Sequence, residues 1–328
     1  MSWHNARNAF QSARSAANGG SGRFNIMLVK GWACMGYTLS NGILTVDIAD
    51  VGAYQGSRFD WTGFITQVTL MPGNHTFCVP ESLVSGEGSG GKGLCNEFGI
   101  SRAIGYDNAP VGGWFPKPGV GLLQKHNNFP YTFNHDYHVN RFKVSLENGL
   151  HGIKFTVHPL ECRGYSIQLT KTISLSQDKL NIAYELQNKG SMHFQTEEYV
   201  HNFIGIDNNE VGSYYELRLP GSVKIEEPES SFTAELLEVS GGRISWSRTP
   251  DRPFYCKLTG WERGDEDLNW ELLHTPTGAG MRESGDFQVS QMVLWGERHV
   301  ISPEVFINID LAPGQSQRWN RNYQFFTV

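Results

Sequence analysis

A period-two pattern of apolar residues between positions 166 and 186 constrains the fold of this chain more than any other feature. Ile167, Leu169, Ile173 and Leu175 share one face of SIQLTKTISLS, and the run LNIAYEL repeats the pattern after a turn at Gln177. Successive side chains of a strand point to opposite faces, so this spacing predicts a pair of strands with one buried face each. Similar alternation at 44–48 and 305–311, without an interior run of three helical turns, predicts an all-β chain with very little helix.

No linker divides the chain, so residues 24–328 are predicted to form a single β-sandwich domain. Residues 1–23 are expected to form an N-terminal arm or a short helix that ends in glycines. The run GEGSGGKG at 86–93 resembles a phosphate-binding loop, but Gly93 stands where that motif needs Ser or Thr. No helix-forming run follows it, so this segment is interpreted as a long loop.

Charge and cysteine usage exclude several classes of protein. The 27 Lys and Arg residues are outnumbered by 33 Asp and Glu residues, so the chain lacks the basic surface that nucleic-acid binding requires. Five scattered cysteines without a CxxC pair argue against a disulfide framework or a zinc site. The start of the sequence has no apolar signal region and no run reaches the length of a membrane span, so a cytoplasmic protein without membrane contact is expected.

Candidate site residues gather in four segments rich in glycine, proline or aromatic residues, the kind of loop that carries binding groups. The candidates are Arg58, Asp60, Glu97, Lys117, His135, Tyr137, Glu198, His201, Trp295 and Glu304. Arg58 and Asp60 are two residues apart and would share a face in a strand, either to hold a hydroxyl-rich ligand or as a structural ion pair. His135 and Tyr137 would likewise project to one side of an extended segment.

His201 and the carboxylates near it are suited to proton transfer near neutral pH. Glu198 and His201 have the spacing of metal ligands on a helix, but their segment resembles a strand. Since neither HExxH nor a third ligand is evident, no metal is expected. Trp295 could stack against a pyranose ring, and Glu304 begins a strongly alternating strand.

Three stretches of the sequence resemble the aldose 1-epimerases of the galactose mutarotase-like superfamily. They are NGILTVDIADVGAYQGSRFDWTG, the run LTKTISLSQDKLNIAYELQNKG with the following HNF, and PEVFINIDLAPGQSQRW. The resemblance covers roughly residues 40–328 and identifies a divergent branch. It implies a β-supersandwich, with His201 as the general acid that protonates the ring oxygen and Glu304 as the base. The family's "HGG" and "GRxxNR" motifs are absent, which leaves His135 or His126 for the second histidine and Arg58 for the sugar-binding arginine.

The function implied is the interconversion of sugar anomers by acid–base catalysis without a cofactor. Arg58, Glu97 and Lys117 would hold hydroxyls or, on an acidic sugar, a carboxylate or sulfonate. We also predict that Arg58, Lys117, His135 and His201 converge on one aromatic-lined cleft. Two alternatives remain open: a lyase or isomerase acting on a uronate or other acidic sugar, and a non-catalytic carbohydrate-binding domain. In each case the partner is a small sugar or an oligosaccharide, and the oligomeric state is left open.

Overall fold

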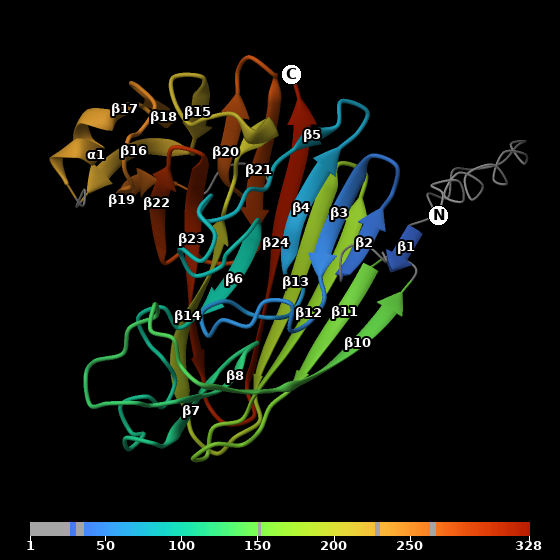
Figure 1. The fold of residues 1–328 in the computed structure, drawn as a ribbon, viewed down its shortest axis with the longest axis vertical. Helices are drawn as coiled ribbons and strands as arrows, with labels where there is room; N and C mark the ends of the chain where they lie inside the picture. The colour runs from blue at the N-terminus through green and yellow to red at the C-terminus, as the bar shows by residue number, and fades with distance from the viewer. Residues whose placement is uncertain (1–26, 31–35, 150–151, 227–229, 263–266) are drawn as a thin grey trace, which may run out of the picture.

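The computed structural model describes residues 27–30, 36–149, 152–226, 230–262 and 267–328, and within these ranges the chain forms a β-sandwich (Figure 1). The arm expected for residues 1–23 lies outside the described residues. The helical elements within the described ranges include the short α-helix α1 (Ser231–Leu236) and a 3-10 turn (Ile206–Asn208). The prediction of an all-β chain with very little helix is confirmed.

Two large antiparallel sheets and one small sheet contain the strands of the described residues. The first sheet contains, in spatial order, β1 (Met27–Lys30), β2 (Gly36–Ser40), β3 (Leu44–Ala49), β4 (Ile65–Leu70), β6 (Leu94–Phe98), β14 (Phe194–Asn202), β23 (Val300–Leu311), β22 (Gln291–Glu297), β19 (Phe254–Trp261) and β16 (Gly221–Glu226), with β5 (His75–Thr76) paired to β4. The second contains β10 (Lys143–Gly149), β11 (Gly152–His158), β12 (Ile167–Ser176), β13 (Lys179–Asn188), β24 (Ser316–Thr327), β21 (Ala279–Gly285), β20 (Leu268–His274), β15 (Tyr215–Arg218), β18 (Arg243–Trp246) and β17 (Leu237–Ser240). The small sheet consists of β7 (Trp114–Lys117), β8 (Gly121–Gln124) and β9 (Val139–Arg141).

The alternating segments supply the core between the two large sheets. The apolar faces of β12 and β13 are buried in it, as are Leu44, Val46 and Ile48 of β3. Gln177 takes a φ of 53° in the turn that joins β12 to β13. Burial of each large apolar side chain contributes about 1.5–3 kcal/mol to the folded state. The strand pattern read from the sequence therefore corresponds to the physical interior of the protein.

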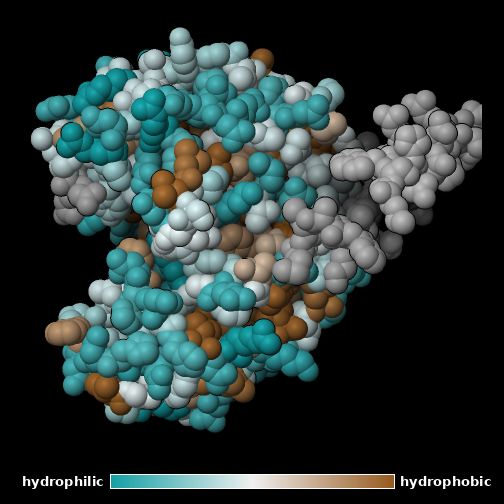
Figure 2. Space-filling view, in the orientation of Figure 1, coloured by the Kyte–Doolittle hydropathy of each residue, from teal (hydrophilic) through white to brown (hydrophobic). Residues whose placement is uncertain are grey.

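Strand β14 has both faces covered and carries the residues of interest. Val200 points into the core between the sheets, and Tyr199 and His201 therefore point to the opposite face, where Phe133 of the loop between β8 and β9 approaches. In the space-filling view the surface is hollowed between the lobe that contains β7 and β8 and the lobe that contains α1 and β15–β19 (Figure 2). None of the helices in the described ranges has the length and hydropathy needed to cross a membrane.

Candidate active site

His201 and Glu304 meet on neighbouring strands of the first sheet. The register that pairs Glu198 of β14 with Ile307 of β23 places His201 opposite Glu304 when it is continued by three residues. The Nε2 atom of His201 lies 3.3 Å from Oε1 of Glu304, and both side chains are buried. Pro303 lacks an N–H group, so the ladder is interrupted at this point and side chains take over the pairing.

Ser302 defines how the proton is placed on the imidazole of His201. Its hydroxyl accepts a hydrogen bond from the Asn202 N–H (2.9 Å) and donates one to Glu304 Oε1 (3.1 Å). His201 Nδ1 lies 2.9 Å from the same oxygen and must be the donor, because a hydroxyl has only one hydrogen to give. The hydrogen of the neutral ring therefore sits on Nδ1, and the lone pair of Nε2 faces Glu304.

Burial keeps both members of this pair uncharged near neutral pH. It lowers the pKa of His201 well below its usual value, and the nearby charge of Arg58 lowers that pKa further. Burial also raises the pKa of Glu304 to about 8, although Arg58 and the Ser302 hydroxyl oppose the rise. One proton is thus held between Nε2 of His201 and the carboxyl group of Glu304, and it resides on Glu304.

Arg58 lies in the loop between β3 and β4, and not in a strand. Its guanidinium contacts Glu97 through Nε at 2.9 Å, Glu81 through Nη1 at 3.4 Å and the Tyr199 hydroxyl through Nη2 at 3.1 Å. Burial opposes the charge of Arg58, but Tyr199 and Glu97 outweigh it and raise the pKa above its usual value. Arg58 therefore remains a cation at the edge of the site.

Asp60 is not a partner of Arg58, so the prediction that the two share one strand face is wrong. Its carboxylate is buried against Lys171 of β12 at 2.5 Å and accepts bonds from the N–H and hydroxyl of Thr62. The Asp60 N–H donates to the Asn96 carbonyl, which ties the loop to β6. Asp60 anchors the loop that carries Arg58, and it lines neither of the two cavities that Arg58 borders.

Glu97 and Lys117 form a layer behind Arg58. Glu97 is fully buried on β6, where it accepts a bond from the Tyr199 hydroxyl at 2.6 Å. Lys117 Nζ lies 3.3 Å from Glu97 and 3.2 Å from the Tyr131 hydroxyl. Burial lowers the pKa of Lys117, and Glu97 partly offsets this effect. Neither residue lines the cavity that contains His201, so they support Arg58 from behind.

A cavity of about 480 Å³ opens above the His201–Glu304 pair. It is lined by Arg58, Glu81, Ile100, Phe133, Tyr199, His201, Tyr255, Trp295 and Glu304. The ring of Trp295 lies edge-on to His201 at 5.0 Å, and the ring of Phe203 stacks on that of His201 at 4.0 Å. A small aromatic-lined space with an acid–base pair at its floor has the composition of a small-molecule site.

The other predicted residues lie elsewhere. Glu198 points into the core, where it pairs with Arg321 at 2.8 Å, because residues three apart on a strand face opposite sides. Tyr137 is buried in a separate aromatic cluster. His135 lines a neighbouring cavity that also includes Arg58. Arg58 and His201 therefore share one cavity and His135 lines the adjoining one, but Lys117 lines neither.

Sequence reasoning missed Glu81, Tyr199, Ser302 and Phe133. Tyr199 and Ser302 each stand two residues from a predicted site residue on a strand, so the period of two could have identified them. Glu81 and Phe133 lie in loops whose folded path no local pattern encodes. Within the described part of the chain, no group of three or more His, Cys, Asp or Glu side chains is arranged to hold a metal ion.

Comparisons by sequence found neither a matching family model nor a matching curated protein. Comparison of structures did find proteins with a similar fold. A galactose mutarotase-like protein of Clostridium acetobutylicum matches with a TM-score of 0.57 at 11% identity, over 93% of this chain and 99% of its own. The Slr1438 protein of Synechocystis sp. PCC 6803 matches with a TM-score of 0.57 at 12% identity, over 95% and 100% of the two chains.

A galactose mutarotase related enzyme of Lactobacillus acidophilus is also similar, with a TM-score of 0.56 at 14% identity over 89% of this chain and 98% of its own. At such identities the likeness concerns the backbone and its topology. It agrees with the two-sheet architecture described above. This chain therefore has the galactose mutarotase-like fold.

Proposed function

We propose that this protein interconverts the anomers of a sugar by acid–base catalysis at His201 and Glu304. The observation that carries the proposal is the contact of these two side chains at 3.3 Å on the floor of an aromatic-lined cavity. The ring oxygen and the anomeric hydroxyl of a sugar are bonded to the same carbon. An acid and a base side by side can therefore serve both atoms of one hemiacetal.

The pair supplies one proton donor and one proton acceptor at neutral pH. The sequence resemblance assigns the base to Glu304 and the acid to His201. The buried geometry favours the reverse starting point, in which Glu304 protonates the ring oxygen and Nε2 of His201 takes the proton of the anomeric hydroxyl. The ring opens, the bond between C1 and C2 rotates, and ring closure returns both protons. In both assignments the pair carries one transferable proton. When the ring closes after the rotation, the group that acted as the acid acts as the base, and the base acts as the acid.

The other residues of the cavity are suited to holding the sugar. Trp295 offers an aromatic edge and Arg58 a cationic donor in the same space as His201. Ser302 acts as a positioning residue, because it orients the imidazole without facing the cavity itself. No step of this reaction calls for a cofactor.

A direct test is NMR exchange between the α and β anomers of glucose and galactose in the presence of the protein. We expect saturation to transfer between anomers faster than in buffer, and Glu304→Gln and His201→Asn to reduce the enzymatic rate by about 10²- to 10⁴-fold. The matched control is Glu297→Gln, which alters a half-buried carboxylate on β22 outside the cavity. Exchange that is equally fast in Glu304→Gln and Glu297→Gln would contradict the proposal.

Elimination or isomerisation of an acidic sugar is the second candidate. It is favoured by the unprotonated Nε2 of His201 in the same cavity as Arg58, since a base beside a cation can remove a proton next to a carboxylate. A new absorbing double bond upon incubation with uronates, without anomer exchange, would identify it. Saturable sugar binding with neither reaction would instead identify a carbohydrate-binding domain.

A further inference from the structure

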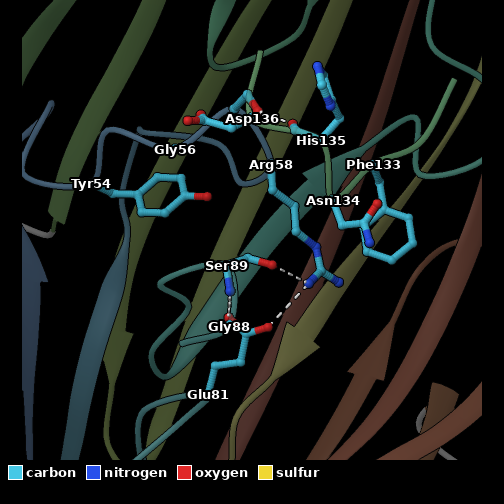
Figure 3. A pocket seen from close by; sticks show the side chains of 11 residues that line it. Tyr54, Gly56, Arg58, Glu81, Gly88, Ser89, Phe133, Asn134, His135 and Asp136 are labelled. Carbon is cyan, nitrogen blue, oxygen red and sulfur yellow. Dashed lines mark hydrogen bonds and ion pairs between the residues drawn. The ribbon is translucent and has the colours of Figure 1, made fainter. Parts of the chain in front are cut away.

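A second cavity adjoins the cavity that contains His201 and Glu304. It has a volume of about 630 Å³ and is lined by Tyr54, Gly56, Ser57, Arg58, Glu81, Gly88, Ser89, Phe133, Asn134, His135 and Asp136. Three of these residues, Arg58, Glu81 and Phe133, also line the first cavity, so the two spaces are parts of one depression. In Figure 3 the Arg58 side chain runs from the end near His135 and Asp136 towards Glu81 and Ser89.

Arg58 has little hydrogen-bonding capacity left for an anionic ligand. Of its five N–H groups, that on Nε is used by Glu97, two on Nη1 by Glu81 and Ser89, and one on Nη2 by Tyr199. One Nη2 hydrogen remains without a partner among the described residues. Recognition of a carboxylate or phosphate by arginine typically uses two parallel N–H bonds, and this geometry is not open here.

The net charge of the depression also disfavours an anion. The two cations Arg58 and Lys117 are balanced by the two carboxylates Glu81 and Glu97 that contact them. Asp136 adds a further carboxylate at the rim of the second cavity. An acidic sugar would therefore be desolvated without gaining an unpaired cation. The charges favour a neutral ligand.

The remaining walls of the second cavity match the surface of a sugar ring. Ser57, Asn134 and Asp136 supply hydroxyl, amide and carboxylate groups, and the Tyr54 hydroxyl points towards Arg58 (Figure 3). The aromatic ring of Phe133 lies 4.6 Å from the Arg58 guanidinium, at the wall that both cavities share. Mixed donors and acceptors beside an aromatic ring suit a ligand with hydroxyls on its edge and C–H groups on its face.

We propose that the second cavity holds the second ring of a neutral oligosaccharide whose reducing end lies at His201 and Glu304. The inference rests on the proposed acid–base function, since that function defines where the reducing end lies. The glycosidic bond passes Arg58 and Phe133, where the remaining Nη2 hydrogen of Arg58 can donate to a sugar oxygen. The substrate class is thus a neutral disaccharide or longer chain, and not a phosphorylated or uronic sugar.

Anomer exchange on maltose, cellobiose, glucose, glucose 6-phosphate and glucuronate tests the substrate class. We expect a higher kcat/KM for at least one disaccharide than for glucose, and the lowest values for the two anions. The double variant Asn134→Ala/Asp136→Ala should lower the ratio of disaccharide to glucose kcat/KM by about tenfold, the effect of losing two ordinary hydrogen bonds. The matched control Asn140→Ala, on β9 and outside both cavities, should leave the ratio unchanged. A ratio unaltered in the double variant, or a preference for an anion, overturns the inference.

The charge argument has its own test in Glu81→Gln. The amide oxygen of glutamine can keep the bonds that Glu81 accepts from the Ser89 and Gly91 N–H groups, but the charge that neutralises Arg58 is lost. We expect kcat/KM for glucuronate to rise several-fold relative to glucose. Glu87→Gln removes an equal charge from an exposed position of the same loop and should change nothing. A glucuronate-to-glucose ratio that does not rise in Glu81→Gln counts against the neutral-ligand assignment.

Binding separates failure of this inference from failure of the proposed function. The Kd values of maltose, cellobiose and glucose can be measured by NMR titration of the Glu304→Gln variant. If no sugar is turned over by the unaltered protein, the acid–base proposal fails. Tighter binding of a disaccharide than of glucose would still support the second ring site, and equal or weaker binding of both disaccharides would reject it.

Discussion

On each side of the first sheet an arginine lies between two glutamates, and the two clusters differ in what surrounds them. On the inner face, Arg321 of β24 reaches Glu198 at 2.8 Å and Glu283 at 2.6 Å. On the outer face, Arg58 contacts Glu97 and Glu81. All three side chains of the inner cluster are 0% exposed, whereas the Arg58 side chain is 10% exposed and borders two cavities.

This difference indicates that one ionic arrangement serves two purposes. Arg321 also donates to the Val305 carbonyl and lies 4.7 Å from the ring of Phe287, so protein groups enclose it. It joins the two sheets through contacts that leave no space for a ligand. Arg58 is also held by protein groups, Glu97 and Tyr199, but its other side borders the two cavities. The inner cluster should therefore affect stability, and the outer cluster should affect sugar binding and turnover.

The largest effect expected is on turnover, from Glu304→Gln on the outer face. Glutamine preserves shape but cannot exchange the proton, so turnover should fall by about 10² to 10⁴. Sugar affinity and the unfolding midpoint should change little, because the Glu304 side chain is held uncharged by burial in any case. Anomer exchange and thermal melting of one sample provide both readouts. A variant that melts early but turns over normally would mean that Glu304 has a structural role and that the proton donor lies elsewhere.

Arg321→Met should produce the largest loss of stability. It leaves Glu198 and Glu283 buried without a cation, which typically costs about 3–5 kcal/mol of unfolding free energy. Urea denaturation measures this cost, and turnover per folded molecule should be retained. Arg58→Met should cost less stability, because Glu81 lies at a cavity wall where water can reach it. Equal stability losses for the two variants would remove the distinction between the clusters.

A matched pair of tyrosines sharpens the comparison at smaller magnitude. Tyr199 on the outer face donates to Glu97, and Tyr323 on the inner face donates to Asn202 at 3.1 Å. Tyr323→Phe leaves the buried Oδ1 of Asn202 without its donor, and Tyr199→Phe removes one bond to Glu97 and the acceptor of Arg58 Nη2. Each change should cost about 1–3 kcal/mol of stability. Only Tyr199→Phe should also reduce kcat/KM, since Tyr199 orients Arg58 in the cavity. If Tyr323→Phe reduces kcat/KM to the same extent, the inner face contributes to the site.

The smallest effect expected is the dependence of activity on pH. The proton shared by the pair resides on Glu304 with a pKa of about 8, so kcat/KM should be level through neutral pH and fall to half near pH 8. His201 stays neutral in this range, because burial and then Arg58 lower its pKa. Glu283→Gln, on the inner face, should leave the profile unchanged. A rate that increases above pH 8 would show that the pair acts without its proton.

Several elements of the fold were predictable because their signal is local. The buried faces of β3, β12 and β13, and of β23 from Ile307 to Leu311, repeat every second residue, and the interior of the sandwich selects that repeat. Lys171 interrupts the apolar face of β12 with a charge. That interruption signals a buried partner, but nothing in the strand itself identifies Asp60, which lies in a loop more than a hundred residues earlier.

The sequence by itself determined the all-β class, the strand faces, and the presence of His201 and Glu304 in segments that resemble aldose 1-epimerases. Only the tertiary structure decided which of the polar candidates face one cavity. Glu198 and His201 are close in sequence, yet the pleat of β14 sends them to opposite faces. Arg58 and Asp60 lie in one loop, whose path turns their side chains towards different partners. The physical reason is that strand faces follow a local period, whereas charge pairing and cavity lining depend on long-range register and loop paths.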